Sequence, residues 1–179
     1  MAIAFELVVN FGHDVEAAQR ARAIAAGWPA LTAGGHRIGL HPAALDRVSS
    51  EYSDGTYAEL SVVPVGVGMG VALDRALPQA ALTSVEFTQL GRGLYDLLTQ
   101  FDGYQAAKVG WDPESLVDVD CLRAEWADEL ARGALDGLVL SERLRDSLGA
   151  VSLSTSFAPG FVWIPWRGAR PSALTADRS

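Results

Sequence analysis

Three glycines, Gly66, Gly68 and Gly70, follow a β-prone run at a place where a phosphate-binding loop could begin. A dinucleotide-binding turn needs the spacing G-x-G-x-x-G, because each glycine permits a close approach of the pyrophosphate or of the following helix. If the motif is counted from Gly66, its third glycine position is occupied by Val71, and if it is counted from Gly68, by Leu73. The Gly-Lys-Ser/Thr sequence of a P-loop does not follow either. We therefore interpret this stretch as a bend between a strand and a helix. A loop that binds a ligand through its bare amides is the alternative.

The chain has three histidines, His13, His36 and His41. On a strand, His36 and His41 would face opposite sides, so the pair cannot chelate one ion. In a split βαβ fold, His13 and His41 would follow two parallel strands and lie at one edge of the sheet. The alternative to ordinary surface histidines is therefore a metal or acid–base site at His13 and His41, with Asp14 or Asp46 nearby, or a ligand pocket formed by His13, Asp14 and His41.

Other candidates for chemistry are few. Carboxylates next to Cys121 raise the pKa of a thiol and weaken it as a nucleophile. Asp118 and Asp120 could hold a divalent ion, but residues two apart on a helix point about 200° apart and do not converge. No nucleophile elbow and no Ser/His/Asp set can be identified. The sequence predicts no catalytic residue, no cofactor and no metal.

The net charge is −8, and it is concentrated between residues 96 and 136, where ten acidic residues face three basic ones. A field of one sign attracts partners of the other sign and repels nucleic acid. Solubility alone is the alternative explanation. On a helix after Pro113 with an apolar stripe of Val119, Leu122, Trp126 and Leu130, the acidic residues would face solvent. We expect the following carboxylates to bind a partner: Asp112, Glu114, Asp118, Glu125, Asp128 and Glu129.

Tryptophans gather in the C-terminal half of the chain. Trp163 and Trp166 are three apart and would point to opposite faces of a strand, so one of them, beside Arg167, is expected to be an exposed anchor. Tryptophan and arginine are enriched at the hot spots of protein interfaces. We therefore add Trp163, Trp166 and Arg167 to the predicted partner-binding residues.

Hydrophobic periodicity predicts the elements that must position these residues. Apolar residues alternate between 3 and 11, which is typical of a half-buried strand. A helix follows from Asp14 to Gly27, then a short strand at 34–41 and one helical turn at 41–48, with Pro42 as its first residue. Asp54-Gly55 predicts a tight turn before a strand at 56–65.

The helix after Leu82 has the clearest signals. Thr83 and Glu86 have the spacing of a capping box, and apolar residues recur at helical spacing as far as Phe101. Gly91 and Gly93 inside this helix predict close approach by another element. A strand near 104–111, the acidic helix, a short helix capped by Ser141 and an aromatic edge strand at 157–168 complete the pattern.

The order β-α-β-β-α-β up to Trp111 predicts an α+β fold, a split βαβ (ferredoxin-like) sandwich of a mostly antiparallel sheet and two helices. We expect a single domain at 1–168, with the core at 1–112 and a helical and aromatic-strand extension at 113–168. The tail at 169–179 is expected to be flexible.

Composition narrows the function classes. Hydrophobic residues make up 49%, and no apolar run approaches the ~18 residues of a membrane helix. The start lacks a signal-peptide pattern, so a cytoplasmic location is expected. Thirteen arginines against one lysine indicate a bacterium with a GC-rich genome. We predict a non-catalytic acidic protein that docks a basic protein partner, as inhibitors and immunity proteins do, and that binds neither nucleic acid nor membrane. A small-molecule enzyme or ligand-binding domain is one alternative, and a structural subunit of a larger assembly is another. A homodimer is compatible with each.

Overall fold

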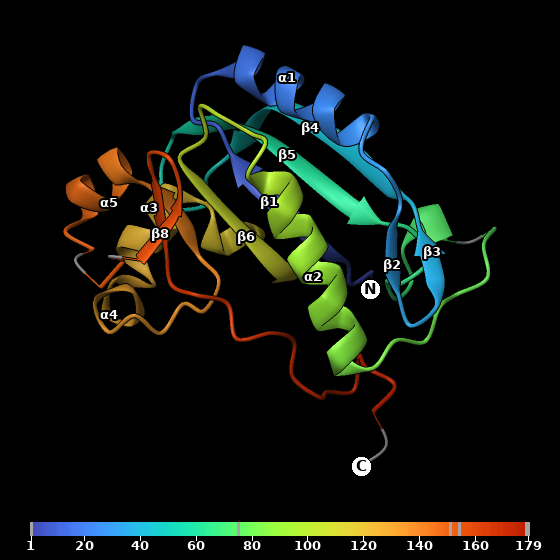
Figure 1. Ribbon diagram of the computed structural model, residues 1–179. Coiled ribbons are helices and arrows are strands. Elements are labelled where there is room, and N and C mark those ends of the chain that lie inside the picture. The colour runs from blue at the N-terminus through green and yellow to red at the C-terminus, as the bar shows by residue number, and fades with distance from the viewer. Residues whose placement is uncertain (1, 75, 151, 154, 178–179) are drawn as a thin grey trace.

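A seven-stranded antiparallel sheet runs through the protein in the order β4-β5-β1-β6-β7-β9-β8 (Figure 1). The computed structural model describes residues 2–74, 76–150, 152–153 and 155–177. The strands are β1 (Phe5–Asn10), β2 (Leu31–Ala33), β3 (His36–Ile38), β4 (Leu40–Ser49), β5 (Thr56–Pro64), β6 (Ala106–Trp111), β7 (Val139–Ser141), β8 (Thr155–Ala158) and β9 (Phe161–Trp163). The helices are α1 (Val15–Ala26), α2 (Ser84–Leu98), α3 (Val119–Ala124), α4 (Ala127–Ala131) and α5 (Glu142–Leu148), with short 3-10 turns η1 (Ala72–Asp74) and η2 (Glu114–Leu116).

The predicted α+β fold is confirmed. Strand β1 pairs with β5 on one side and with β6 on the other, and β4 pairs with β5 as a hairpin. Helix α1 connects β1 to the β2–β4 segment, and α2 connects β5 to β6. This order is compatible with a split βαβ arrangement. The hairpin of β2 and β3 is an addition that forms its own two-stranded sheet.

Helices α1 and α2 cover one face of the sheet. Asp14 caps α1, with its side chain accepting from the amide of Ala17. The capping box of Thr83 and Glu86 is present at the start of α2, as predicted. The buried side of α2 meets Phe5, Leu7 and Val9 of β1 in the larger apolar cluster. Its fully buried residues include Phe87, Leu90, Leu94, Leu97 and Leu98.

Both interior glycines of α2 allow a side chain from another segment to approach the helix backbone closely, as the sequence indicated. A Cβ at Gly91 would collide with the ring of Trp166, and one at Gly93 would lie 2.9 Å from a methyl carbon of Leu31. Trp166 also lies 5.5 Å from the ring of Tyr95. The C-terminal segment is therefore packed against α2.

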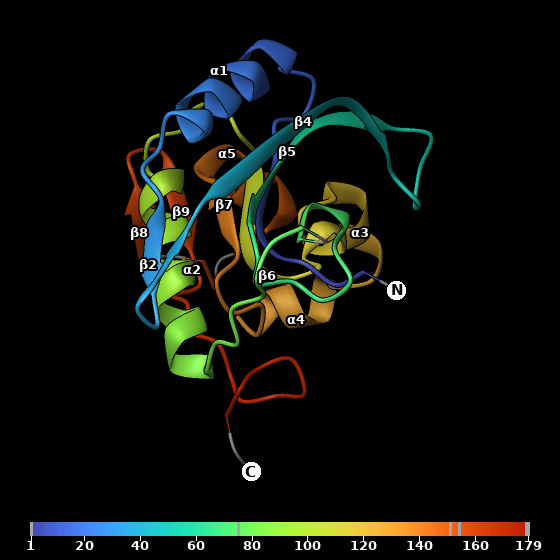
Figure 2. The ribbon, with the colours of Figure 1, turned by 90° about the vertical axis from the view of Figure 1, so that its right-hand side faces the viewer.

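The opposite face of the sheet is covered in part by α3 and α4, and Figure 2 shows α2 and α3 on opposite sides. The predicted single acidic helix is wrong, because the chain forms η2, α3 and α4 with breaks between them. Its apolar stripe is nevertheless packed: Leu122 and Leu130 are buried, and Val119 and Trp126 pack against the same cluster. Ser141 caps α5 and Gly149 ends it, as predicted.

Three further expectations are corrected. Residues 41–48 belong to strand β4 rather than to a helical turn, and Pro42 is accepted because β4 is an edge strand. The aromatic strand is a hairpin of β8 and β9. The expected flexible tail instead packs along α2: Ala169 donates to Thr88, and Asp177 accepts from the amide and hydroxyl of Ser84. Residues 178 and 179 lie outside the described part of the chain.

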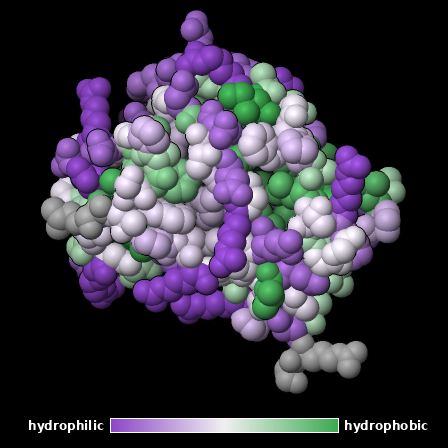
Figure 3. Space-filling model, viewed as in Figure 1, coloured by the Kyte–Doolittle hydropathy of each residue, from purple (hydrophilic) through white to green (hydrophobic). Residues whose placement is uncertain are grey.

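In the described part of the chain, no helix is long and apolar enough to cross a membrane. Figure 3 shows the face that carries α2, where apolar patches are separated by hydrophilic side chains.

Candidate functional site

Alternate residues of β1 and β5 point to the face of the sheet away from α2. In β1, Glu6, Val8 and Asn10 lie on this second face, because Phe5, Leu7 and Val9 occupy the first. The register pairs Val8 with Ser61 and Asn10 with Glu59. Glu6, Glu59 and Ser61 therefore share one face of two neighbouring strands.

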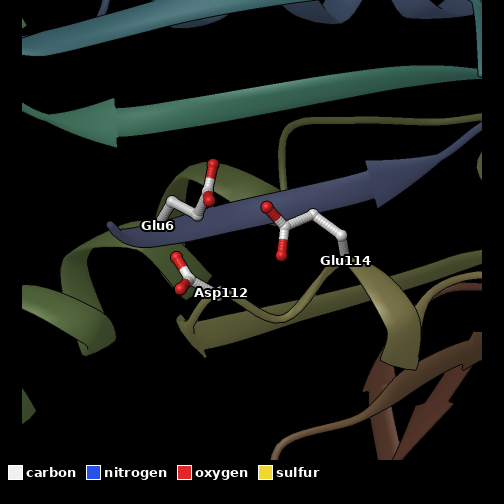
Figure 4. Close-up of side chains that lie close together, drawn as sticks. All are labelled: Glu6, Asp112 and Glu114. Carbon is white, nitrogen blue, oxygen red and sulfur yellow. The ribbon is translucent and has the colours of Figure 1, made fainter. Parts of the chain in front are cut away.

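Three carboxylates converge at the start of β1 (Figure 4). Each of Glu6, Asp112 and Glu114 offers an oxygen, and these oxygens all lie within 4.8 Å of one another. Asp112 follows β6 directly and has φ 42°, a left-handed conformation that non-glycine residues rarely adopt. Its Oδ1 accepts from the amide of Ala4 at 2.8 Å. This bond fixes the Asp112 side chain beside the first strand.

A cavity of about 350 Å³ opens beside these residues. Its walls include an apolar part, where Leu45 and Tyr52 are 55% and 44% exposed. The acidic part consists of Glu51, Glu59, Asp112, Glu114 and Asp118, and Val48, Ser49, Tyr57, Ser115 and Cys121 complete the lining. The cavity thus combines five carboxylates with an exposed aliphatic and an exposed aromatic side chain.

Burial shapes the electrostatics of this cavity. Glu6 is 5% and Glu59 is 7% exposed, and desolvation raises the pKa of each carboxyl to about 7. The hydroxyl of Ser61 donates to Glu6 and opposes part of that rise, whereas Glu114 and Asp112 add to it. The hydroxyl of Tyr57 likewise lowers the pKa of Glu59 against the effect of burial, and Glu114 raises it.

The cavity carboxylates have no basic partner among the described residues. The ion pairs of that part of the chain are Arg20–Asp102, Arg123–Asp120, Arg132–Glu129 and Arg145–Asp146, and none of them includes a carboxylate that lines the cavity. In addition, Oε2 of Glu59 is buried without a hydrogen-bond partner. A buried carboxylate without a counter-charge is costly, and such sites are candidates for function.

The predicted partner-binding carboxylates differ in their location and in their exposure to solvent. Asp112 and Glu114 line the cavity, and Glu125 and Asp128 are exposed. Asp118 was expected at the surface, but it is buried: it caps α3 and accepts from the hydroxyl of Ser50 at 2.7 Å.

Glu129 is half-buried and pairs with Arg132 at 3.1 Å. Helix α3 ends at Ala124 and α4 begins at Ala127. Glu125 and Glu129 therefore do not share one helix, although the sequence predicted a single helix for both.

Neither of the two tryptophans predicted to bind a partner is fully exposed. Trp163 and Trp166 are half-buried, and their rings lie 5.4 and 5.5 Å from Tyr95 of α2. They pack with the larger apolar cluster, on the side of the sheet away from the carboxylates. Arg167 is exposed beside them, with its amide donating to Asp136.

The predicted site at His13, Asp14 and His41 is not brought together. His13 lies beyond the end of β1 and lines a small cavity with Ser50 and Tyr57. His41 pairs with Val63, near the other end of β5. The sequence predicted a strand that ends at His41, whereas His41 is the second residue of β4, which begins at Leu40. Asp14 serves as the cap of α1.

In the loop of Gly66, Gly68 and Gly70, a carboxylate of the protein itself occupies the backbone amides. The amides of Gly66 and Gly68 donate to the carboxylate of Asp74 at 2.7 and 3.2 Å. Two amides that a phosphate would use are thus already bonded, which supports the interpretation of this stretch as a bend.

Sequence reasoning missed Glu6 and Glu59. The available signal was a charged residue inside each of two otherwise apolar strands, in FELVVN and TYAELSVVP. Strand β1 was expected to be half-buried, but all six of its residues are buried. A glutamate in such a strand must be satisfied by a partner or serve a ligand.

Comparison with protein-family models, with curated proteins and with solved structures found no match for this chain.

Proposed function

We propose that this protein is a non-catalytic binding protein that docks a basic protein partner at the carboxylate-lined cavity. The observation that supports this most is the set of cavity carboxylates without a basic partner in the described part of the chain. An arginine or lysine side chain of a partner supplies the missing charge. Charge-assisted hydrogen bonds to carboxylates are about twice as strong as neutral ones.

The residues around the cavity are suited to binding a protein, because they offer apolar contacts as well as charge. Leu45 and Tyr52 are exposed at its wall and offer apolar contact area. Glu51, Glu114 and Glu125 are exposed around them, and the pKa of the Tyr52 phenol is raised by desolvation and then by the nearby Glu125 carboxylate. An apolar centre with a charged surround is the usual anatomy of a protein interface. Neutralisation or regulation of a basic protein, as by an immunity protein or inhibitor, is the role we propose.

The test compares two doubly charge-reversed proteins of equal net charge. Glu114→Lys with Glu125→Lys changes the cavity and its surround, whereas Asp96→Lys with Asp102→Lys changes exposed acids on the α2 side. Each protein is immobilised and exposed to lysate of the source organism in the presence of a chelator. A basic protein should be retained by the wild type and the control but lost from the cavity variant.

Kinetics with the purified partner complete the test. Because charge steering acts on the association rate, the cavity variant should associate about tenfold more slowly at low salt, and the difference should shrink as salt is added. Equal association by both variants, or equal loss by both, would show that the cavity is not the docking site.

A further inference from the structure

We propose that the side of the cavity where Asp112 and Glu114 meet Glu6 of β1 is a binding site for one divalent cation that prefers oxygen ligands, held by these three residues. Their oxygens lie within 4.8 Å of one another and come from β1, from the end of β6 and from η2 (Figure 4). Oxygen ligands of Ca²⁺ or Mg²⁺ lie about 2.0–2.6 Å from the ion, so opposite ligands are separated by about 4–5 Å. The spacing of the three carboxylates therefore fits a single ion.

A second observation points to a ligand at the same place. Glu59 is 7% exposed, lines the cavity together with Asp112 and Glu114, and has one oxygen, Oε2, without a hydrogen-bond partner. It is near enough to Glu6 and Glu114 for their charges to interact. The charges of neighbouring carboxylates repel one another, and either protonation or a cation among them relieves this repulsion. Glu59 is outside the group of three, and water bound to the ion is the ligand that could reach its free oxygen from the cavity that they share.

Two of the three ligands are held in place before an ion arrives. The hydroxyl of Ser61 donates to Oε2 of Glu6, and the amide of Ala4 donates to Oδ1 of Asp112. Each bond leaves the other oxygen of the same carboxylate for an ion. Outer hydrogen bonds of this kind orient metal ligands in general.

The ligand set selects the class of ion. It contains only carboxylate oxygens, and the described residues include neither a histidine nor a cysteine within this cluster. Oxygen sets suit Mg²⁺, Mn²⁺ and Ca²⁺, whereas thiolate and imidazole select zinc and copper. Water fills the remaining coordination positions, because Asp112 and Glu114 are exposed.

This inference goes beyond the proposed docking function and does not depend on it. The ion lies among Glu6, Asp112 and Glu114, whereas the partner contacts Leu45, Tyr52 and the exposed carboxylates of Glu51 and Glu125, so that Glu114 alone borders both. The assay for the ion contains no partner, and the assay for the partner contains a chelator. Either proposal can therefore fail while the other stands.

The test is a titration of chelator-treated protein with Mn²⁺ alone. Free Mn²⁺ is followed by electron paramagnetic resonance, and the melting temperature is measured in parallel, since a ligand that binds only the folded state raises it. We expect saturation at about one ion per chain with competition by Ca²⁺ or Mg²⁺, as at an oxygen site. Glu6→Gln and Glu114→Gln should each weaken Mn²⁺ binding at least about tenfold.

Glu125→Gln is the matched control, because it removes one exposed carboxylate outside the cluster. It should bind Mn²⁺ as the wild type does. If Glu6→Gln fails to fold, Glu114→Gln decides alone, since its side chain is exposed. Absence of saturable binding at millimolar Mn²⁺, or equal weakening in Glu125→Gln, would overturn the proposal.

Discussion

The two faces of the central sheet are built from alternate residues of the same strands, but they are buried in different ways. On the face toward α2, Leu7, Val9, Leu60 and Val62 have no exposed surface and meet only apolar side chains of the cluster. On the other face, Glu6 and Glu59 are almost as deeply buried and carry groups that prefer water. Burial of apolar area stabilises the fold by about 25 cal/mol per Å², whereas burial of a carboxylate costs free energy. The second face also carries an apolar cluster, but its two buried glutamates lower stability rather than add to it.

Asn10 shows that a polar residue on this face can be purely structural. Its amide donates to the carbonyl of Val117 at 2.8 Å, and its side-chain oxygen accepts from Gly12 at 2.7 Å. These bonds join β1 to the segment before α3 and to the turn before α1. Glu59, paired with Asn10 across the strands, has an oxygen with no such partner. The comparison distinguishes a residue that completes the fold from one that is available to a ligand.

The largest expected effect is on the apolar face. Leu94→Ala should lower the free energy of unfolding by about 2–5 kcal/mol, because Leu94 has no exposed surface and truncation leaves a cavity. Urea unfolding measures this change. Val85→Ala, on the same helix but with a side chain that is 75% exposed, should cost less than about 0.5 kcal/mol. Equal costs at the two positions would contradict the assigned packing of α2.

The carboxylate face should make stability depend on pH in an unusual direction. Glu6 and Glu59 have pKa values of about 7 in the folded protein against 4.5 as model carboxyls, so the folded state holds protons that the unfolded state has released. Stability should therefore fall as pH rises from about 4.5 to about 7, by at most about 3 kcal/mol for each group. Urea unfolding in chelator at about pH 5 and about pH 8 measures the loss.

The same measurement separates the contribution of one carboxylate. Glu59→Gln should be more stable than the wild type at about pH 8 and should lose part of the pH dependence. Glu125→Gln, which removes an exposed carboxylate, should retain it. A wild-type protein that is more stable at about pH 8 than at about pH 5 would contradict the burial of these two glutamates.

A smaller effect is expected where the C-terminal segment packs on α2. Gly91→Ala should cost about 1–3 kcal/mol, because the added methyl meets the ring of Trp166. In a Trp166→Leu background the same change should cost less, since the smaller side chain leaves room. A double-mutant cycle measures this coupling. Additive costs would show that Trp166 does not press on Gly91.

The smallest effect is expected at the cavity wall. Leu45 is 55% exposed, so Leu45→Ala should change the free energy of unfolding by less than about 0.5 kcal/mol. A loss of partner binding in this stable variant would assign Leu45 to docking rather than to the core. A large loss of stability would instead show that Leu45 is packed in a core, as the side chains on the α2 face of the sheet are.

Local signals allowed some elements to be predicted well. Helix α2 was found because its capping box and its apolar stripe lie within the helix itself. Strand β4 was missed, because Pro42 and the alanines after it favour a helical turn locally, whereas pairing with β5 over eight residue pairs decides the conformation. The break between α3 and α4 at Trp126 is likewise set by packing rather than by the stripe, which continues across it.

The candidate site was predicted in part. Asp112 and Glu114 were named from their position in an acidic segment, but Glu6 and Glu59 were not. The reason is that burial of β1 on both faces depends on contacts with residues more than one hundred positions away, such as Asp112 with Ala4 and Val117 with Asn10. A strand's own sequence shows which residues share a face, but it does not show what will cover that face.

The attachment of the C-terminal segment to α2 has a consequence for biosynthesis. The amide of Ser84, in the first turn of α2, is bonded by Asp177, which lies 93 residues later, and the flank of the same helix is filled by Trp166. While the ribosome is still synthesising the intervening residues, α2 has neither contact. The nascent chain can pair β1, β4, β5 and β6 before that point, but the outer side of α2 is completed only when Trp166 and Asp177 have left the exit tunnel. A stalled chain ending before Trp166 should therefore be cleaved by protease at α2 more readily than the released protein.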